Sequence, residues 1–150
     1  METGNLMVDA ETAFARAQWR RRGARAASWL RRRGDSTRLE HIEQTLGAVP
    51  PARRRNVGLA AVPLCSIVGT TEASKARRFD SSFRPPPSSR HRWERLWIAA
   101  RRGAPLPPIS VYRLGDSHYV DDGHHRVSVA RSLGMAAIDA EVTELGRTRL

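Results

Sequence analysis

Apolar residues recur at helical spacing in the middle of the chain. One face carries four of them at i, i+3, i+4 and i+7: Trp93, Leu96, Trp97 and Ala100. Gly103 ends the pattern, and Ser88 or Ser89 can cap its start. Since an apolar stripe at this spacing is usually buried against a sheet, we expect a helix whose tryptophans lie in a core instead of stacking on bases.

A strand, a tight turn and a helix follow one another closer to the C-terminus. Tyr119 and Val120 suit a strand, and Asp122-Gly123 is a strong turn dipeptide because glycine accepts positive φ. Beyond the turn, apolar positions return to helical spacing: Val127, Ala130 and Leu133. Gly134 fits the position just past a helix end. The pattern predicts a helix that opens at the glycine turn.

The first quarter of the chain predicts a basic helical arm. Asp9 can cap this helix, and Gly23 weakens its middle, where the helix can either continue or split in two. Its apolar side carries Ala10, Ala13, Phe14, Ala17, Ala24, Ala27 and Leu30, with Trp19 and Trp29 interleaved. A second helix is expected over residues 38–46, where Thr37 and Glu40 form a capping box.

Two short helices joined by a turn can form a helix-turn-helix, but most such pairs bind no DNA. We therefore favour an arm that packs on the main domain with its arginines in solvent. Residues 50–56 are interpreted as a linker, because two prolines break any helix and three arginines keep the segment in water. The chain is thus divided into an extension, 1–55, and a domain, 56–150. A second irregular stretch is expected over residues 69–89.

The composition is that of a polar chain, and its length is sufficient for one hydrophobic core. Of its 150 residues 40% are hydrophobic, and the mean hydropathy is −0.51. No apolar run approaches the ~18–20 residues of a membrane span, and the sequence shows no secretory signal, so we expect a cytoplasmic protein. The single cysteine, Cys65, excludes an internal disulfide and a cysteine-based zinc site, and is interpreted as a small core residue.

The formal net charge is +11 at pH 7, with a pI of about 11.5. Nearly all the positive charge is arginine, since Lys75 is the single lysine. A GC-rich genome explains arginine in place of lysine, but not the excess of base over acid. That excess favours a polyanionic partner such as DNA, and otherwise a nucleotide or an acidic protein. The candidate nucleic-acid contacts lie in the arm: Arg20, Arg21, Arg22, Arg31, Arg32 and Arg33.

The helix start at Gly123 combines several features of a phosphate-binding turn. Free backbone N–H groups and the positive end of the helix dipole attract anions. Gly123 lets the backbone approach a phosphate closely, and the amides of His124, His125 and Arg126 can donate to it. The planar guanidinium of Arg126 also matches a phosphate. A plain β–α connection with polar surface residues is the alternative for so short a motif.

Three side chains of this turn are candidate catalytic groups. His124 or His125 can assist phosphoryl transfer, or only orient a phosphate. Asp122 can hold Mg²⁺ through water or act as a base, although an aspartate before glycine is also an ordinary turn former. His118 and Asp121 are close in sequence, but adjacent side chains point in different directions. We therefore predict no transition-metal site.

The order of motifs over residues 57–145 resembles the ParB N-terminal/sulfiredoxin superfamily. Members of this superfamily have an opening V-P-L-x-x-I strand, a PPI-x-V strand with a hairpin partner, and a DGHHR or related G-x-x-R turn that opens a helix. The matching segments here are residues 62–67, 106–112, 115–116, 119–126, 133–134 and 138–142. The resemblance implies an α+β fold with a small mixed sheet and packed helices.

The resemblance also implies a nucleotide site. The matching arginine of the superfamily contacts nucleotide phosphates, a role that we carry to Arg126, and Pro108 is included in the phosphate-binding set. The superfamily's region after the first strand lies beside the nucleotide, which makes Arg77, Arg78 and Arg84 candidates to reach its phosphates. For any one of them a solvated loop arginine is the ordinary role. The implied ligand is CTP or ATP/ADP with Mg²⁺.

The sequence of the turn differs in two ways from other members of the superfamily, and these differences reduce the number of activities to consider. Its DNA-clamp members have Gly-Glu-Arg-Arg where this chain has Gly-His-His-Arg, and sulfiredoxin has a cysteine in a turn where this chain has none. The turn matches the free-serine-kinase-like branch better. That branch needs an acidic base in the loop after the first strand, where Glu72 and Asp80 are the available acids.

Three functions are left open by the sequence. The first is a nucleoside-phosphate-binding regulatory protein that associates with DNA through its arm. The second is a small ATP/ADP-dependent phosphotransferase acting on a metabolite. The third is a non-catalytic adaptor that binds an acidic partner through the arginine-rich arm.

Overall fold

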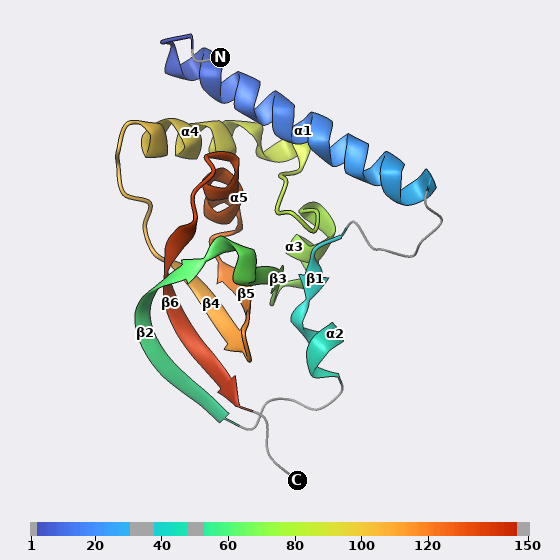
Figure 1. Cartoon of the computed structure of the whole chain (residues 1–150), viewed down its shortest axis with the longest axis vertical. Coiled ribbons are helices and arrows are strands. Elements are labelled where there is room, and N and C mark those ends of the chain that lie inside the picture. Colours follow the sequence, from blue (N-terminus) through green and yellow to red (C-terminus); the bar gives the residue numbers. More distant parts are fainter. Residues whose placement is uncertain (1–2, 31–37, 48–52, 147–150) are drawn as a thin grey trace.

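The computed structural model describes residues 3–30, 38–47 and 53–146. They form a six-stranded mixed sheet with packed helices, which confirms the predicted α+β fold (Figure 1). In chain order the elements are α1 (Leu6–Leu30), β1 (Glu40–His41), α2 (Ile42–Leu46), β2 (Arg53–Pro63), the 3₁₀ turn η1 (Leu64–Ser66), β3 (Ile67–Thr70), α3 (Ala73–Arg78), η2 (Pro87–Ser89), α4 (Arg90–Arg101), β4 (Ile109–Leu114), β5 (Ser117–Asp122), α5 (His124–Ser132) and β6 (Ala137–Gly146).

The strands lie in the order β1-β3-β5-β4-β6-β2. Strand pairs β1–β3, β3–β5 and β4–β6 are parallel, whereas β4–β5 and β2–β6 are antiparallel. The expected turn between β4 and β5 is present, and its Gly115 has a φ of 62°, which glycine adopts without a side-chain clash. The last strand, β6, therefore lies inside the sheet, between β4 and β2.

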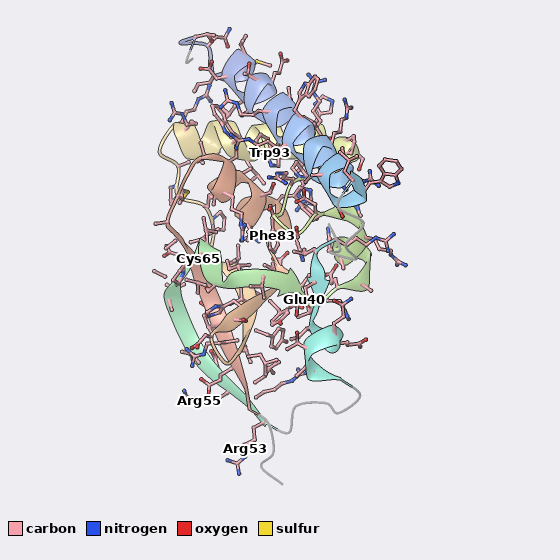
Figure 2. All side chains as sticks on the ribbon, turned by 45° about the vertical axis from the view of Figure 1, so that its right-hand side comes forward. Glu40, Arg53, Arg55, Cys65, Phe83 and Trp93 are labelled. Carbon is pink, nitrogen blue, oxygen red and sulfur yellow. The ribbon has the colours of Figure 1, made fainter. Side chains whose placement is uncertain are left out.

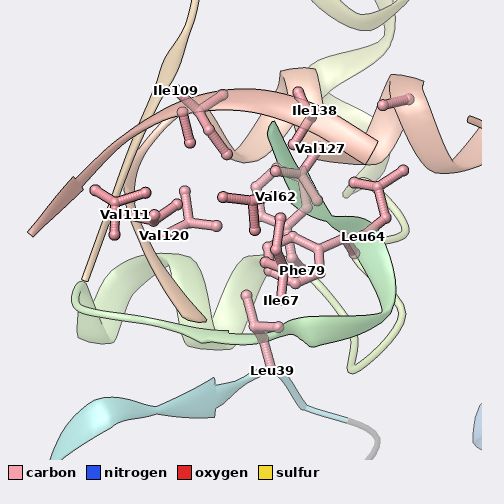
Figure 3. Packing of buried hydrophobic residues seen from close by; sticks show 14 residues of the cluster. Leu39, Val62, Leu64, Ile67, Phe79, Ile109, Val111, Val120, Val127 and Ile138 are labelled. Atoms are coloured by element: carbon pink, nitrogen blue, oxygen red, sulfur yellow. The ribbon is translucent and has the colours of Figure 1, made fainter. Parts of the chain in front are cut away.

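One face of the sheet carries the main core (Figure 3). Ile109 and Val111 of β4 alternate with less buried residues, as do Ile138, Ala140 and Val142 of β6, because successive side chains of a strand point to opposite faces. Val127 of α5 packs onto this face, so the helix that opens at the glycine turn is fixed directly on the sheet. A smaller cluster that includes Ile42 and Tyr119 forms separately, next to α2.

Helix α4 confirms the predicted apolar stripe, because Trp93 is fully buried and Trp97 is 7% exposed. The Trp93 indole N–H donates to Ser128 Oγ of α5 over 2.9 Å, and Phe14 of α1 meets the Trp93 ring edge-on at 5.6 Å between centroids. The two tryptophans are therefore core residues that join α1, α4 and α5, and Figure 2 shows Trp93 beneath α1.

Helix α1 is a single helix of 25 residues that passes through Gly23 without a break. Asn5 caps it, since Asn5 Oδ1 accepts the Met7 amide over 3.1 Å, whereas Asp9 lies inside the helix. The half that holds Ala10 and Phe14 packs on α4, as expected for a packed arm, and Figure 1 shows α1 crossing over α4. No helix within the described ranges is long and apolar enough to span a membrane.

Two element predictions were wrong. Residues 38–46 form a helix only from Ile42 onward, because Leu39 is buried in the core and residues 40–41 pair with β3. Helix α2 thus lies at the sheet edge, apart from α1, and the two do not form a helix-turn-helix (Figure 1). Residues 53–56 belong to β2 instead of a linker, so this strand runs across the boundary placed at residue 55.

The other differences fall between β2 and α4. The stretch 69–89, expected to be irregular, holds α3 and the short η2. Cys65 lies in η1 and is exposed, because the 3₁₀ turn between β2 and β3 points its side chain away from the core. The arginines at 31, 32 and 33, and Thr37 of the capping box, lie outside the described residues.

Candidate functional site

The turn between β5 and α5 has the backbone expected of a helix-opening glycine turn. Gly123 has a φ of 114°, and a Cβ placed there would lie 2.4 Å from Ile109 Cγ2. Only glycine fits this position without displacing β4. The first amides of α5, beginning at His124, have no partner within the helix, as at every α-helix N-terminus. These amides and the helix dipole make the turn receptive to an anion.

A cavity of about 630 Å³ opens in front of this turn. Three basic side chains reach it from other elements, namely Lys75 of α3 and Arg92 and Arg95 of α4. Within the described residues none of the three has a hydrogen bond or an ion pair. The acids that line the cavity are Glu72, Asp121 and Asp122.

Arg126 lines the same cavity, but its guanidinium is already engaged. Its NH1 donates to the carbonyl oxygens of Pro107, at 2.9 Å, and Pro108, at 2.7 Å, and its NH2 donates to Asp122 Oδ2 at 3.0 Å. Arg126 therefore ties the start of β4 to the start of α5. Pro108 takes part in the site by accepting this bond, and the carboxylate of Asp122 is held by the same arginine.

His124 is buried behind the turn. Its Nε2 lies 2.6 Å from Thr70 Oγ1, and the Thr70 hydroxyl donates to the Val120 carbonyl. Because that hydroxyl has one proton, the imidazole N–H must donate to Thr70, which places the ring proton on Nε2. Burial, followed by the charge of Lys75, lowers the pKa of His124 to about 3. The ring is therefore neutral at pH 7.

His125 is fixed in a similar way on the α4 side. Its Nε2 lies 2.8 Å from Ser89 Oγ, and Phe79 packs against it edge-on, with 5.1 Å between ring centroids. Burial, followed by the charge of Arg92, lowers the pKa of His125 to about 4. The neutral imidazole, fixed by a buried hydroxyl, stabilises the turn. Because the ring is not protonated to the cation, it cannot act as a cationic proton donor to a phosphate.

The structure does not bring Arg84 to this turn. Arg84 pairs with the buried Asp80, at 3.2 Å between NH1 and Oδ2, and lines a different cavity. Arg77 and Arg78 are exposed on α3 and do not line the cavity at Gly123 either. Of the two acids considered as a base, Glu72 lies at this cavity and Asp80 does not. No group of three histidine, cysteine, aspartate or glutamate side chains in the described residues can hold a metal ion.

The candidate nucleic-acid residues that the structure describes all lie on α1. Arg20 and Arg22 are exposed, whereas Arg21 is partly buried and donates to the Arg84 carbonyl over 3.5 Å. Trp19 and Trp29 on the same helix are 73% and 80% exposed. This surface is separate from the cavity at Gly123, which α1 does not line.

Sequence reasoning missed the three basic residues that face the turn. Arg92 and Arg95 flank Trp93 on the polar side of the predicted helix, and this signal was present but resembled an ordinary solvated face. Lys75 is the single lysine of the chain, yet nothing in its neighbours in sequence separates it from a loop cation. The arrangement of α3 and α4 around α5 is what brings the three together.

No family model matches the chain, and no curated protein matches it. Among solved structures it is similar to the sulfiredoxin from Arabidopsis thaliana, with a TM-score of 0.43 and 19% sequence identity, over 56% of this chain and 82% of that one. The residues of this chain must therefore carry any functional proposal.

Proposed function

We propose that the protein binds a nucleoside phosphate, with the phosphates at the N-terminus of α5 and in contact with Lys75, Arg92 and Arg95. The supporting observation is that these three cations, without partners in the described residues, line one cavity with a helix N-terminus. Cations held close together without counter-charges repel one another. A polyphosphate would relieve that repulsion, and its oxygens would accept hydrogen bonds from the free amides at the start of α5.

The acids of the cavity do not cancel this charge. Asp122 is paired with Arg126, and Asp121 accepts a hydrogen bond from the Thr71 hydroxyl at 2.7 Å. Glu72 is the remaining acid of the cavity. It is the candidate ligand for Mg²⁺, because Mg²⁺ is commonly held by one or two carboxylates together with substrate phosphates. The cavity volume of about 630 Å³ falls in the ~300–1,000 Å³ range of small-molecule sites.

Binding fits the geometry better than phosphoryl transfer. Both histidines of the turn are buried, neutral and bonded to hydroxyls, and Asp122 is neutralised by Arg126. An acid or base near neutral pH needs a pKa close to that pH and access to the substrate proton. We therefore assign the turn a binding and regulatory role, and place the phosphotransferase second.

Substitution of Lys75 and Arg92 by glutamine is expected to abolish nucleotide-dependent stabilisation. Melting temperature would be measured with CTP, ATP, ADP and GTP, each with and without Mg²⁺; a ligand at ~100 times its Kd stabilises a fold by about 2.7 kcal/mol. The matched control is Arg77→Gln with Arg102→Gln, which removes two exposed charges from α3 and the end of α4 outside the cavity.

The proposal fails if no nucleotide raises the melting temperature of the unmodified protein. It also fails if K75Q/R92Q and R77Q/R102Q respond equally to every nucleotide. Lys75 and Arg92 are preferable to Arg126 for this test, because removing Arg126 would free the Pro107 and Pro108 carbonyls and disturb the fold itself.

A second proposed function, association with DNA, is supported by the exposed face of α1. Arg22, Arg25 and Trp29 follow one another at i, i+3 and i+7, and basic residues interleaved with exposed aromatic rings suit a nucleic-acid strand. Substituting Arg22 and Arg25 by glutamine is expected to weaken binding to a fluorescent oligonucleotide and to reduce the salt dependence by about two phosphate contacts. An unchanged salt slope would contradict this role for α1.

A further inference from the structure

A second cavity, of about 580 Å³, lies between α1, α4, α5 and the loop before η2. None of its lining residues is shared with the cavity at Gly123. Figure 2 shows two of its buried aromatic residues, Trp93 beneath α1 and Phe83 closer to the sheet. This cavity exists because α1 packs over α4, so it belongs to the arm as much as to the sheet domain.

The walls of this second cavity are strongly basic. Five arginines from four segments line it: Arg16, Arg20, Arg84, Arg101 and Arg131. Asp9 is the one acid that lines it within the described residues, and its Oδ1 already accepts the Thr3 amide at 2.9 Å and the Thr3 hydroxyl at 2.8 Å. The side chains of Arg16 and Arg20 have no hydrogen bond or ion pair with any described residue. The cavity therefore carries a surplus of positive charge.

Two buried donors at this cavity also lack acceptors. Ser128 is 4% exposed, and its Oγ accepts the Trp93 indole N–H, which leaves its own hydroxyl proton unused among the described residues. The Nε of Arg131 is buried without a partner, while its NH2 donates to the carbonyls of Leu64 and Ile67. A buried donor normally has an acceptor, and neither of these two has one among the described residues.

The loop that forms one wall is held in a strained conformation. Phe83 has a φ of 58°, a left-handed value that a bulky residue rarely adopts. The carboxylate of Asp80 enforces it, because Oδ1 accepts the amides of Ser82 at 3.0 Å and Arg84 at 2.8 Å. Strain of this kind persists where the surroundings fix it, and it clusters at ligand sites. Here it places Ser82 and Arg84 on the cavity wall.

We propose that this second cavity binds a compact anion with more than one phosphate group. The donors are all N–H or O–H groups, the charges surround a volume of small-molecule size instead of forming an open stripe, and several arginines can share the oxygens of two or three linked phosphates. The site is independent of the nucleoside-phosphate site proposed at Gly123.

The test is calorimetric titration of pyrophosphate and tripolyphosphate into the full chain carrying K75Q/R92Q, in which the Gly123 cavity has lost two cations. Binding is expected to persist in this background and to weaken at least tenfold when Arg16→Gln and Arg20→Gln are added. The matched control adds Arg22→Gln and Arg25→Gln instead, which removes two charges from the same helix without touching the cavity, and should leave affinity within twofold. All three chains must show the same helical content.

Three results would overturn the assignment. The first is no binding of either anion in the K75Q/R92Q background, which would leave the nucleotide proposal at Gly123 intact. The second is equal affinity in the Arg16/Arg20 and Arg22/Arg25 variants. The third is a short oligonucleotide that binds more tightly than tripolyphosphate and depends on Arg16 and Arg20, because the cavity would then serve a polymer.

Discussion

Lowering the pH from 7.5 to 5 is expected to reduce the free energy of unfolding by about 2 kcal/mol for each of His124 and His125. Their pKa values in the folded protein are about 3 and about 4, against 6.5 for an ordinary histidine. The unfolded chain therefore binds more protons than the folded one below pH 6.5. This stabilisation is complete above pH 6.5 and is lost as the pH falls toward 4 and then 3. His118, whose pKa burial also lowers, acts in the same direction.

Urea denaturation at pH 7.5 and pH 5 measures this effect before most carboxylates begin to titrate. His125→Gln should lose roughly half of the pH dependence, because glutamine can still bond Ser89 but cannot be protonated. His91→Gln is the matched control, since it removes an exposed imidazole from α4 in place of a buried one. Equal stability of the unmodified protein at the two pH values would show that the histidines are hydrated and the turn is looser than described.

Replacing Gly123 by alanine is expected to destabilise the protein by about 2–5 kcal/mol. The new Cβ would lie 2.4 Å from Ile109 Cγ2 and 2.8 Å from Ile109 Cβ, so β4 or α5 must move. Overpacking of this kind costs about 1–3 kcal/mol, and the left-handed backbone adds about 1–2 kcal/mol for a residue with a side chain.

Gly115→Ala separates these two contributions. Gly115 also has positive φ, but nothing lies within 4 Å of its ideal Cβ, so alanine there should cost only about 1–2 kcal/mol. Urea denaturation followed by circular dichroism compares the two variants. If the two variants are equally stable, the close approach of Gly123 to β4 does not constrain the turn. Other contacts would then have to fix the position of the amides at the start of α5.

Local sequence patterns predicted the elements whose structure is specified by residues that are close together in the sequence. The stripe of α4 and the Asp122-Gly123 turn each contain their own signal, and both are present. Strand β1 and the first part of β2 have no such signal. Residues 53–56 are three arginines and an asparagine, all exposed, and they form a strand because they pair with β6. Leu39 enters the core through the pairing of β1 with β3.

The candidate site was predicted only where it is contiguous in sequence. The amides after Gly123 lie where the turn motif predicted them, but the role of Arg126 depends on the Pro107 and Pro108 carbonyls, 19 and 18 residues away. Likewise, the histidines look like catalytic groups in sequence, and their neutral, buried state follows from Thr70, Ser89 and Phe79. Distances across the fold decide these roles, and sequence spacing does not encode them.

The central place of β6 in the sheet has a consequence for synthesis of the protein. More than 70 residues separate the end of β2 at Pro63 from the start of β6 at Ala137, and among the described residues β2 pairs with no other strand. At a translation rate of ~5–20 residues per second, several seconds would pass on the ribosome between the synthesis of β2 and that of β6, and about 1–4 seconds between the synthesis of β4 and that of β6. During those intervals the edges of β2 and β4 that pair with β6 can pair with other chains, so a nascent chain stalled before β6 should be a strong chaperone client.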